Sequence, residues 1–174
     1  SRTEEGLPTR IEMRVGEYKS RPNSVITLTG EEFTYAAPEE TAAMMTSLVA
    51  WCNEAMTHSE LTPIEIATLF HYRFIRIHPF QDGNGRIARL IVNFILRRFG
   101  YPMVIIHSED KENYLSALRQ SDVEVGFSPS DGTNASLLQI QPFLKYMVTQ
   151  LERSLELSIK AANGDSIEDD SDFG

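Results

Sequence analysis

The sequence predicts a mainly α-helical protein, in which a bundle of helices carries one β-hairpin on its surface. Apolar residues recur at helical spacing through most of residues 38–161, while strand-like alternation is confined to residues 16–35. The chain has 174 residues, of which 41% are hydrophobic, so it is long enough for one domain with a substantial core. Because two strands alone are not stable in water, we expect the hairpin to pack against the helices.

The hairpin is predicted from a run of mostly β-branched residues between Val25 and Thr29. Gly30 follows this run and suits a turn, and the stretch from Phe33 to Tyr35 suits the returning strand. The expected hairpin therefore has its turn near Gly30 and its second strand just before the first predicted helix.

The first three helices are predicted from their apolar spacing and their end signals. One covers about residues 38–56 and begins with a proline. The next begins with a capping box at Thr62–Glu65 and runs to Ile77, because Pro79 cannot continue it. The third covers about residues 84–99 and is apolar enough to belong at the centre of the bundle.

Two further helices are predicted in the second half of the chain. One covers about residues 108–122, and the other covers about residues 140–161 with Pro142 in its first turn. Between them, residues 126–134 are rich in serine, proline, aspartate and glycine, which predicts a loop.

These patterns divide the chain into three parts. Residues 1–15 are an N-terminal segment, which we expect to be the remainder of a longer chain because residue 1 is serine rather than methionine. Residues 16–162 form the folded domain, and residues 163–174 form an acidic tail with five acidic and no basic residues. Setting these five aside changes the net charge from −9 to −4. This balance argues against non-specific binding to nucleic acid or to anionic membranes.

The cysteine and membrane signals indicate an ordinary cytoplasmic protein. Cys52 is the single cysteine, which excludes an internal disulfide and a cysteine-based zinc site. No apolar run is long enough to span a bilayer, and no signal-peptide pattern opens the chain. Cys52 and His71 lie in apolar helical patterns, so we expect a buried thiol and a partly buried histidine with satisfied nitrogens.

A glycine-rich loop after the second predicted helix has the features of an anion-binding site. Gly83 and Gly85 bracket Asn84. Glycines let the backbone curl so that successive N–H groups converge on one point. Here the curl falls at a predicted helix start, where unpaired N–H groups and the helix dipole favour phosphate.

The charged side chains around this loop point to transfer of a phosphate-containing group. Arg86 and Arg89 are three residues apart, so they share a helix face and can hold a polyphosphate. Asp82 would repel phosphates unless a metal lay between them, and Mg²⁺ takes one or two carboxylates together with phosphate oxygens. His78 precedes the loop, and an imidazole is a suitable base for a hydroxyl. These are the parts that phosphoryl-type transfer requires.

The stretch from His78 to Arg89 reads His-x-Phe-x-Asp-Gly-Asn-Gly-Arg-x-x-Arg. This pattern resembles the signature of the Fic family at every fixed position, and residues 70–77 also resemble the helix before that signature. The resemblance covers about residues 16–150. It implies a Fic catalytic domain over residues 16–162, with protein adenylyltransferase activity (AMPylation).

The resemblance also implies a role for each signature residue and the substrates ATP and Mg²⁺. The reaction would be in-line attack of a Ser, Thr or Tyr hydroxyl of a target protein on the α-phosphorus of ATP, releasing pyrophosphate. The implied roles are His78 as base, Asp82 as Mg²⁺ ligand, Gly83, Asn84 and Gly85 as phosphate binders, Arg86 as a catalytic residue holding the phosphate chain with Arg89, and Phe80 as the anchor of the loop.

Two further segments carry roles by the same resemblance. Gly16-Glu17-Tyr18-Lys19 is similar to a Gly-x-Tyr-Arg pattern in the family's flap, except that Lys19 replaces arginine. Gly16, Tyr18 and Lys19 would then contact a target protein, whose backbone pairs with the flap as an added strand. The helix around Tyr114 is similar to one that lines the family's adenine pocket, which implies that Tyr114 stacks on adenine.

The signature leaves several uses of the scaffold open. The same base and anion cradle would serve removal of AMP, transfer of another phosphate-containing group, or a non-enzymatic nucleotide-binding interaction module. Residues 1–6 match the spelling of the family's inhibitory helix, Ser/Thr-x-x-x-Glu-Gly/Asn, but we expect a linker that matches by chance. Dimers are common in the family, so a homodimer is among the expected assemblies.

Overall fold

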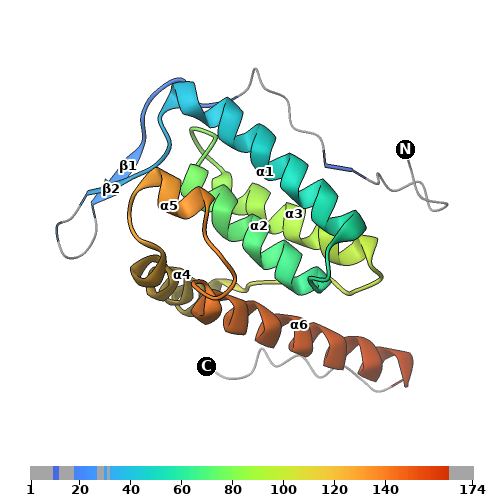
Figure 1. The fold of residues 1–174 in the computed structure, drawn as a ribbon. Helices are drawn as coiled ribbons and strands as arrows, with labels where there is room; N and C mark the ends of the chain where they lie inside the picture. The colour runs from blue at the N-terminus through green and yellow to red at the C-terminus, as the bar shows by residue number, and fades with distance from the viewer. Residues whose placement is uncertain (1–9, 12–17, 27–29, 31, 165–174) are drawn as a thin grey trace.

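The computed structural model describes residues 10–11, 18–26, 30 and 32–164, and it shows a helical bundle with a small antiparallel sheet at one end (Figure 1). The fold class predicted from the sequence is therefore confirmed. In chain order the elements are β1 (Ser24–Ile26), β2 (Glu32–Thr34), α1 (Pro38–His58), α2 (Pro63–Ile77), α3 (Asn84–Arg98), the short 3-10 helix η2 (Ser108–Asp110), α4 (Lys111–Val125), α5 (Pro129–Thr133) and α6 (Gln141–Ala162). Of the helices in these residues, none combines the length and apolar character that a membrane crossing needs.

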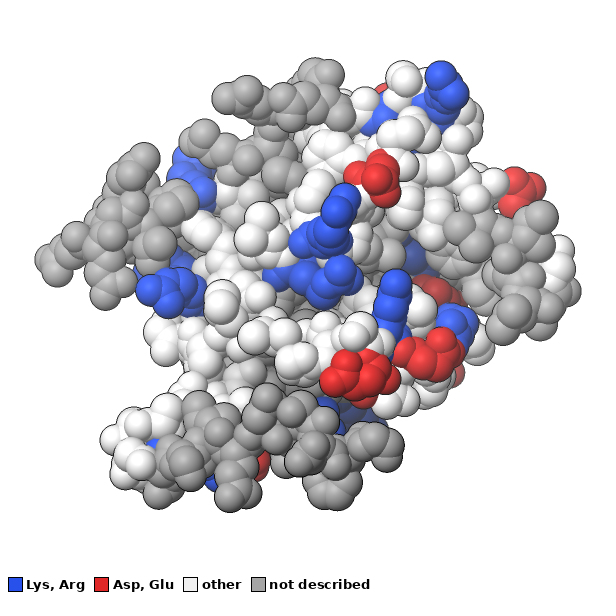
Figure 2. All heavy atoms as spheres, turned by 180° about the vertical axis from the view of Figure 1, so that it is seen from behind, with Lys and Arg blue, Asp and Glu red and all other residues white. Residues whose placement is uncertain are grey.

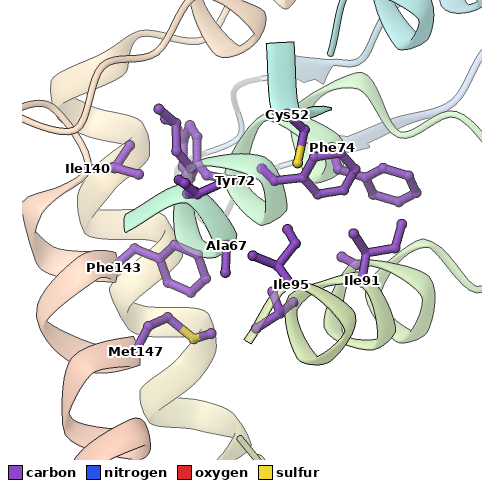
Figure 3. Close-up of a cluster of buried hydrophobic side chains, with 14 of the residues drawn as sticks. Cys52, Ala67, Tyr72, Phe74, Ile91, Ile95, Ile140, Phe143 and Met147 are labelled. Atoms are coloured by element: carbon purple, nitrogen blue, oxygen red, sulfur yellow. The ribbon is translucent and has the colours of Figure 1, made fainter. Parts of the chain in front are cut away.

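Helix α2 lies at the centre of the bundle and contacts α1, α3, α5 and α6. Figure 3 shows Phe74 of α2 on the same side as Cys52 of α1 and Ile95 of α3, whereas Phe143 and Met147 of α6 lie on the other side of α2. All five side chains are fully buried, and burying a side chain of this size contributes about 1.5–3 kcal/mol. The end of α2 is therefore held from several sides, which fixes the position from which the signature loop departs.

Helix boundaries with clear sequence signals lie where they were predicted. At the start of α2, the Thr62 side chain accepts from the Glu65 N–H, and Glu65 Oε1 accepts from the Thr62 N–H at 2.9 Å. Pro142 lies in the first turn of α6, where its missing N–H leaves no hydrogen bond unmade. The helix predicted over residues 108–122 begins as η2 and continues as α4 to Val125.

The prediction of a loop over residues 126–134 is wrong, because helix α5 forms within this segment. The Ser128 side chain accepts from the Asp131 N–H at 3.2 Å, and Asp131 Oδ2 accepts from the Ser128 N–H at 3.1 Å. This is the same capping pattern that predicted the start of α2. In the sequence it was obscured by glycine and other loop-favouring residues around it.

The two strands form the sheet expected of the hairpin. They pair antiparallel with Val25 opposite Phe33, and Gly30 between them has φ +83°, a left-handed conformation that glycine adopts without strain. Phe33 is only 7% exposed, and the guanidinium carbon of Arg76 lies 4.7 Å from the centroid of its ring. The sheet is thereby attached to the C-terminal end of α2, while its use as a target-binding flap stays a prediction.

Candidate active site

The signature loop begins with a sharp turn at His78. This residue has φ 53° and ψ 59°, and it is the one non-glycine residue with positive φ in the described part of the chain. A left-handed conformation costs a residue with a Cβ atom roughly 1–2 kcal/mol. Its N–H still donates to the Phe74 carbonyl at 2.9 Å, which closes the last turn of α2. The backbone strain is therefore placed at the residue predicted to be the base.

The imidazole of His78 is enclosed by neighbouring groups. The ring of Tyr35 stacks on it, with centroids 4.1 Å apart and 13° between the planes. Burial, and then the positive charge of Lys19, lower the pKa of His78 to about 4. The carbonyl of Ile75 opposes this shift, although Nδ1 of His78 has no hydrogen-bond partner among the described residues. His78 is therefore neutral at physiological pH and can accept a proton.

The side chain of Asn84 clamps the loop into shape. Its Oδ1 accepts from the Phe80 N–H at 2.9 Å, and its Nδ2 donates to the Phe80 carbonyl at 2.8 Å. The Phe80 ring packs 5.6 Å from Tyr18 and 6.2 Å from Phe74, in keeping with its predicted anchoring role. The Asn84 side chain is thus engaged by the loop rather than free for phosphate. Only its backbone N–H is left for that role.

The two signature glycines make room for the two signature arginines. A Cβ atom on Gly83 would lie 3.2 Å from Nη2 of Arg86, and one on Gly85 would lie 3.1 Å from Nη1 of Arg89. Gly83 also has φ +80°, as the residue that caps α3. The first-turn N–H groups of α3 have no intrahelical acceptor, so they can bind an anion beside these guanidiniums. Helix α3 runs behind α2 in Figure 1, and Figure 2 shows lysine and arginine side chains gathered near the middle of the rear face.

Asp82 supplies an exposed carboxylate beside the phosphate-binding turn. Its Oδ1 accepts from the Gly83 N–H at 2.8 Å, and its Oδ2 lies 4.0 Å from Nη2 of Arg86. No cluster of three or more His, Cys, Asp or Glu side chains able to hold a metal occurs among the residues searched, which are the described ones. A single exposed carboxylate fits Mg²⁺ that arrives already bound to phosphates, rather than a metal held by protein ligands alone.

The structure places only some of the predicted flap residues, and it does not place Lys19 where a target could contact it. Gly16 lies outside the described residues. Lys19 is only 4% exposed, with its Nζ donating to Asn23 Oδ1 at 2.7 Å and to the Ile77 carbonyl at 3.2 Å. Its backbone N–H donates to the Pro79 carbonyl at 2.8 Å, and burial lowers its pKa to about 8. In this structure Lys19 braces the turn at His78 instead of facing a target.

Tyr114 is buried rather than open to a nucleotide. It is 4% exposed, and its hydroxyl lies 2.7 Å from Nε2 of His71. The guanidinium of Arg89 lies over one face at 5.6 Å from the ring centroid, and with 4% of the residue exposed the ring is not open for stacking on adenine in this conformation. His71 is fully buried, not partly, and its Nδ1 has no partner in the described structure, contrary to the expectation that both nitrogens are satisfied. Burial, and then Arg89, lower the pKa of His71 to about 3.

A buried arginine that sequence reasoning did not single out supports the site from behind. Arg76 is 1% exposed and donates to the Tyr72 hydroxyl and to the carbonyls of Gly126 and Ser128 at 2.7–2.9 Å. It also lies 3.5 Å from Asp122 Oδ1. A charged residue within an otherwise apolar helix was the available signal. Arg76 joins α2 to the loop between α4 and α5 through Gly126 and Ser128, and to α4 through Asp122.

A cavity elsewhere in the bundle does not coincide with the signature. It has a volume of about 420 Å³ and lies between α1, α2 and α5, with Trp51, Arg73 and Asn134 among its lining. The guanidinium of Arg73 lies 4.6 Å from the Trp51 ring and donates to the Ala135 carbonyl. No residue of the signature loop lines it. The chemistry-bearing groups therefore point to the loop, not to this cavity, as the candidate active site.

The fold and the loop define a class of protein, helical bundles in which an open helix start with two arginines lies next to a neutral histidine. Comparison with known families narrows this class. The model of the family described as Fic/DOC matches residues 3–96, which is more than half of the chain. The chain belongs to the Fic/DOC family.

Several curated relatives are named protein adenylyltransferases. Protein adenylyltransferase fic-1 of Caenorhabditis briggsae is 35% identical over 130 residues, which are 75% of this chain and 23% of the relative. Protein adenylyltransferase Fic of Nematostella vectensis is 37% identical over 120 residues, which are 69% of this chain and 25% of the relative. The chain therefore spans about a quarter of the length of these relatives.

A solved structure gives a higher likeness. A Fic-domain-containing signalling protein from Bacteroides thetaiotaomicron is 65% identical to this chain, with a TM-score of 0.87. The match covers 90% of this chain and 58% of that one. Fic-1 from Caenorhabditis elegans is 29% identical with a TM-score of 0.60, over 84% of this chain and 38% of that one.

Proposed function

We propose that this protein transfers AMP from ATP to a hydroxyl side chain of a target protein. The observation that carries the proposal is one rigid loop with a neutral imidazole at its start and an open helix N-terminus with two arginines at its end. Asn84 clamps that loop at a fixed shape, so both halves of the site keep their spacing. The names of the curated relatives support the same activity.

In the proposed reaction His78 takes the proton of the target hydroxyl as its oxygen attacks the α-phosphorus of ATP. A bond forms between that oxygen and the α-phosphorus, and the bond from the α-phosphorus to the oxygen bridging to the β-phosphate breaks. Pyrophosphate leaves with the electron pair of that bond. The first-turn N–H groups of α3 and the guanidiniums of Arg86 and Arg89 would stabilise the negative charge.

Asp82 is the residue that would hold Mg²⁺ together with the phosphates. When bound, Mg²⁺ supplies neutralisation of phosphate charge at the reacting end of the nucleotide. Turning the Asp82 carboxylate toward a metal would release its hydrogen bond from the Gly83 N–H. That N–H would then join the set available for phosphate.

The sheet is the part of the molecule that we propose receives the target. Each strand of a two-stranded sheet has one unpaired edge, to which an extended segment can add. β2 leads directly to Tyr35, whose ring rests on His78. A segment added at this sheet would bring its own hydroxyl side chain close to the base.

The proposal is tested with ATP labelled on either the α- or the γ-phosphate, followed by intact-mass measurement of the protein and of candidate targets. We expect α-label and the mass of one AMP to enter protein, with no incorporation of γ-label. His78→Ala should lower transfer on the order of 10²–10⁴-fold while sparing ATP binding. The matched control is His58→Ala, because His58 is exposed and contacts only Glu54 among the described carboxylates.

The other outcomes separate the alternatives. Incorporation of γ-label would contradict AMP transfer and indicate a kinase. Loss of AMP from a previously modified protein, without incorporation, would indicate that the scaffold removes AMP instead. Binding of ATP without any transfer to a panel of proteins or to the chain itself would indicate a nucleotide-binding module.

A further inference from the structure

Tyr35 makes a contact with His78 that none of the roles described so far uses. Its ring is half-buried, stacks on the imidazole at 4.1 Å, and packs 5.2 Å from the ring of Phe33. Offset or tilted aromatic pairs of this kind are attractive beyond the area that they bury. Tyr35 thus lies between the sheet and the base, in contact with both.

Tyr35 is itself held in place from the sheet side. Phe33 packs edge-on against Phe127 at 5.9 Å, and the guanidinium of Arg76 lies 4.7 Å from the Phe33 ring centroid. Arg76 is fixed by the carbonyls of Gly126 and Ser128. A chain of packed rings therefore connects a buried, hydrogen-bonded arginine to the face of the imidazole.

Hydrogen bonding supports the His78 ring only weakly, because the Ile75 carbonyl acts on the ring without forming a hydrogen bond of ordinary geometry. General bases are commonly oriented by a hydrogen bond to the second ring nitrogen. Here Nδ1 is buried without a hydrogen-bond partner among the described residues, and the backbone of His78 is left-handed. Beside the weak contribution of the Ile75 carbonyl, the stacking contact with Tyr35 is then the main described interaction that holds the plane of the ring.

We infer that Tyr35 is a positioning residue for the base, because its ring sets the plane of the His78 imidazole and keeps water from one of its faces. The inference rests on the proposed function insofar as His78 is the base. The contact is aromatic and does not depend on the Tyr35 hydroxyl. Tyr35→Phe should therefore preserve the contact with His78, whereas Tyr35→Leu, which puts an aliphatic side chain in place of the ring, should not.

The contact is tested first without any activity measurement, by NMR of histidine-labelled protein. In the wild type, nuclear Overhauser effects should join the Tyr35 ring protons to the His78 ring protons. The ring current of Tyr35 should also move the His78 ring signals upfield. Tyr35→Phe should keep this shift, and Tyr35→Leu should abolish it. Tyr101→Ala, which alters an exposed tyrosine, is the matched control and should leave the His78 signals in place.

The activity arm separates positioning from nucleotide binding. Tyr35→Leu should lower kcat on the order of tenfold to a hundredfold, as expected when a reacting group is misplaced by about 1 Å, with the KM for ATP little changed. Tyr35→Phe should restore kcat to near the wild-type value. An equal loss in both variants, or a loss confined to the KM for ATP, would overturn the inference.

The two failures can be told apart. Absence of the nuclear Overhauser effects in the wild type, or His78 signals unaffected by Tyr35→Leu, would refute the positioning contact whatever the enzyme does. If the contact is present and no α-label is transferred, the proposed function fails instead. The wild-type measurement decides the contact even if Tyr35→Leu does not fold.

Discussion

Arg76 and Arg86 lie ten residues apart, on either side of the turn at His78, and their surroundings differ in kind. Arg76 is 1% exposed and donates to three neutral oxygens with Asp122 nearby. The Arg86 side chain is 78% exposed and has one weak contact, 4.0 Å from Asp82. A buried guanidinium whose two terminal nitrogens have acceptors stabilises the fold, although Nε of Arg76 has none among the described residues, whereas an exposed guanidinium next to an open helix start is available for a ligand. The same residue type therefore supports the loop on one side of the turn, and on the other side it is exposed where we propose that the nucleotide binds.

The largest effect is expected from removing the buried member of this pair. Arg76→Ala leaves the Gly126 and Ser128 carbonyls without this donor and the Asp122 carboxylate with the Tyr72 hydroxyl but no cation beside it, so we expect a loss of about 3–5 kcal/mol in the free energy of unfolding. Arg76→Lys keeps the charge but not the fork, and should lose less. Urea titration followed by circular dichroism measures both. If Arg76→Ala were as stable as the wild type, Arg76 would have no structural role to set it apart from Arg86.

The exposed member should behave in the opposite way. Arg86→Ala should change the free energy of unfolding by no more than about 0.5 kcal/mol. If Arg86 stabilises transferred charge, kcat/KM for AMP transfer should fall on the order of 10²–10³-fold. Arg97→Ala, at the other end of the same helix and also exposed, is the matched control. Equal activity in the Arg86 and Arg97 variants would show that Arg86 has no role in AMP transfer.

A smaller effect on stability is expected from His71, which is buried like Arg76 but is neutral in the folded protein. The pKa of His71 is lowered from 6.5 to about 3, so the unfolded chain binds a proton that the folded protein excludes. The neutral His71 therefore costs no free energy of unfolding above pH 6.5. As the pH falls from 6.5 toward 3, the free energy of unfolding decreases by up to about 1.4 kcal/mol per pH unit. His71→Gln should flatten this slope in unfolding titrations between pH 6.5 and 4.5. A slope unchanged by the substitution would mean that His71 is charged when folded.

The sequence predicted those features that depend on local signals. The capping box at Thr62, the proline in the first turn of α6 and the signature loop depend on residues close together in the chain, and each forms as expected. Ser128 and Asp131 form an equally local cap, but the glycine beside them was read as a loop signal. Gly132 is present for another reason, since a Cβ there would lie 2.4 Å from Cβ of Arg76.

Features that depend on distant contacts were not predictable in the same way. Nothing near Lys19 in the sequence indicates that its ammonium will meet the Ile77 carbonyl, 58 residues away. The burial of Tyr114 depends on His71, which is 43 residues away. The stacking of Tyr35 on His78 likewise requires the whole bundle to bring the two rings together. Local chemistry thus identified the loop, while the orientation of its side chains came from tertiary packing.

Asn84 is both the first residue of α3 and the residue whose side chain closes the preceding loop. Unwinding the first turn of α3 would therefore release the Phe80 backbone at the same moment, and opening the loop would remove the support at the helix start. The two segments behave as one cooperative unit. The Phe80 N–H, bound to Asn84 Oδ1, and the Ile87 N–H, bound to the Gly83 carbonyl at 3.1 Å, should therefore exchange with solvent through a shared opening event. The loop and the start of α3, where we propose that phosphate binds, therefore form together and unfold together.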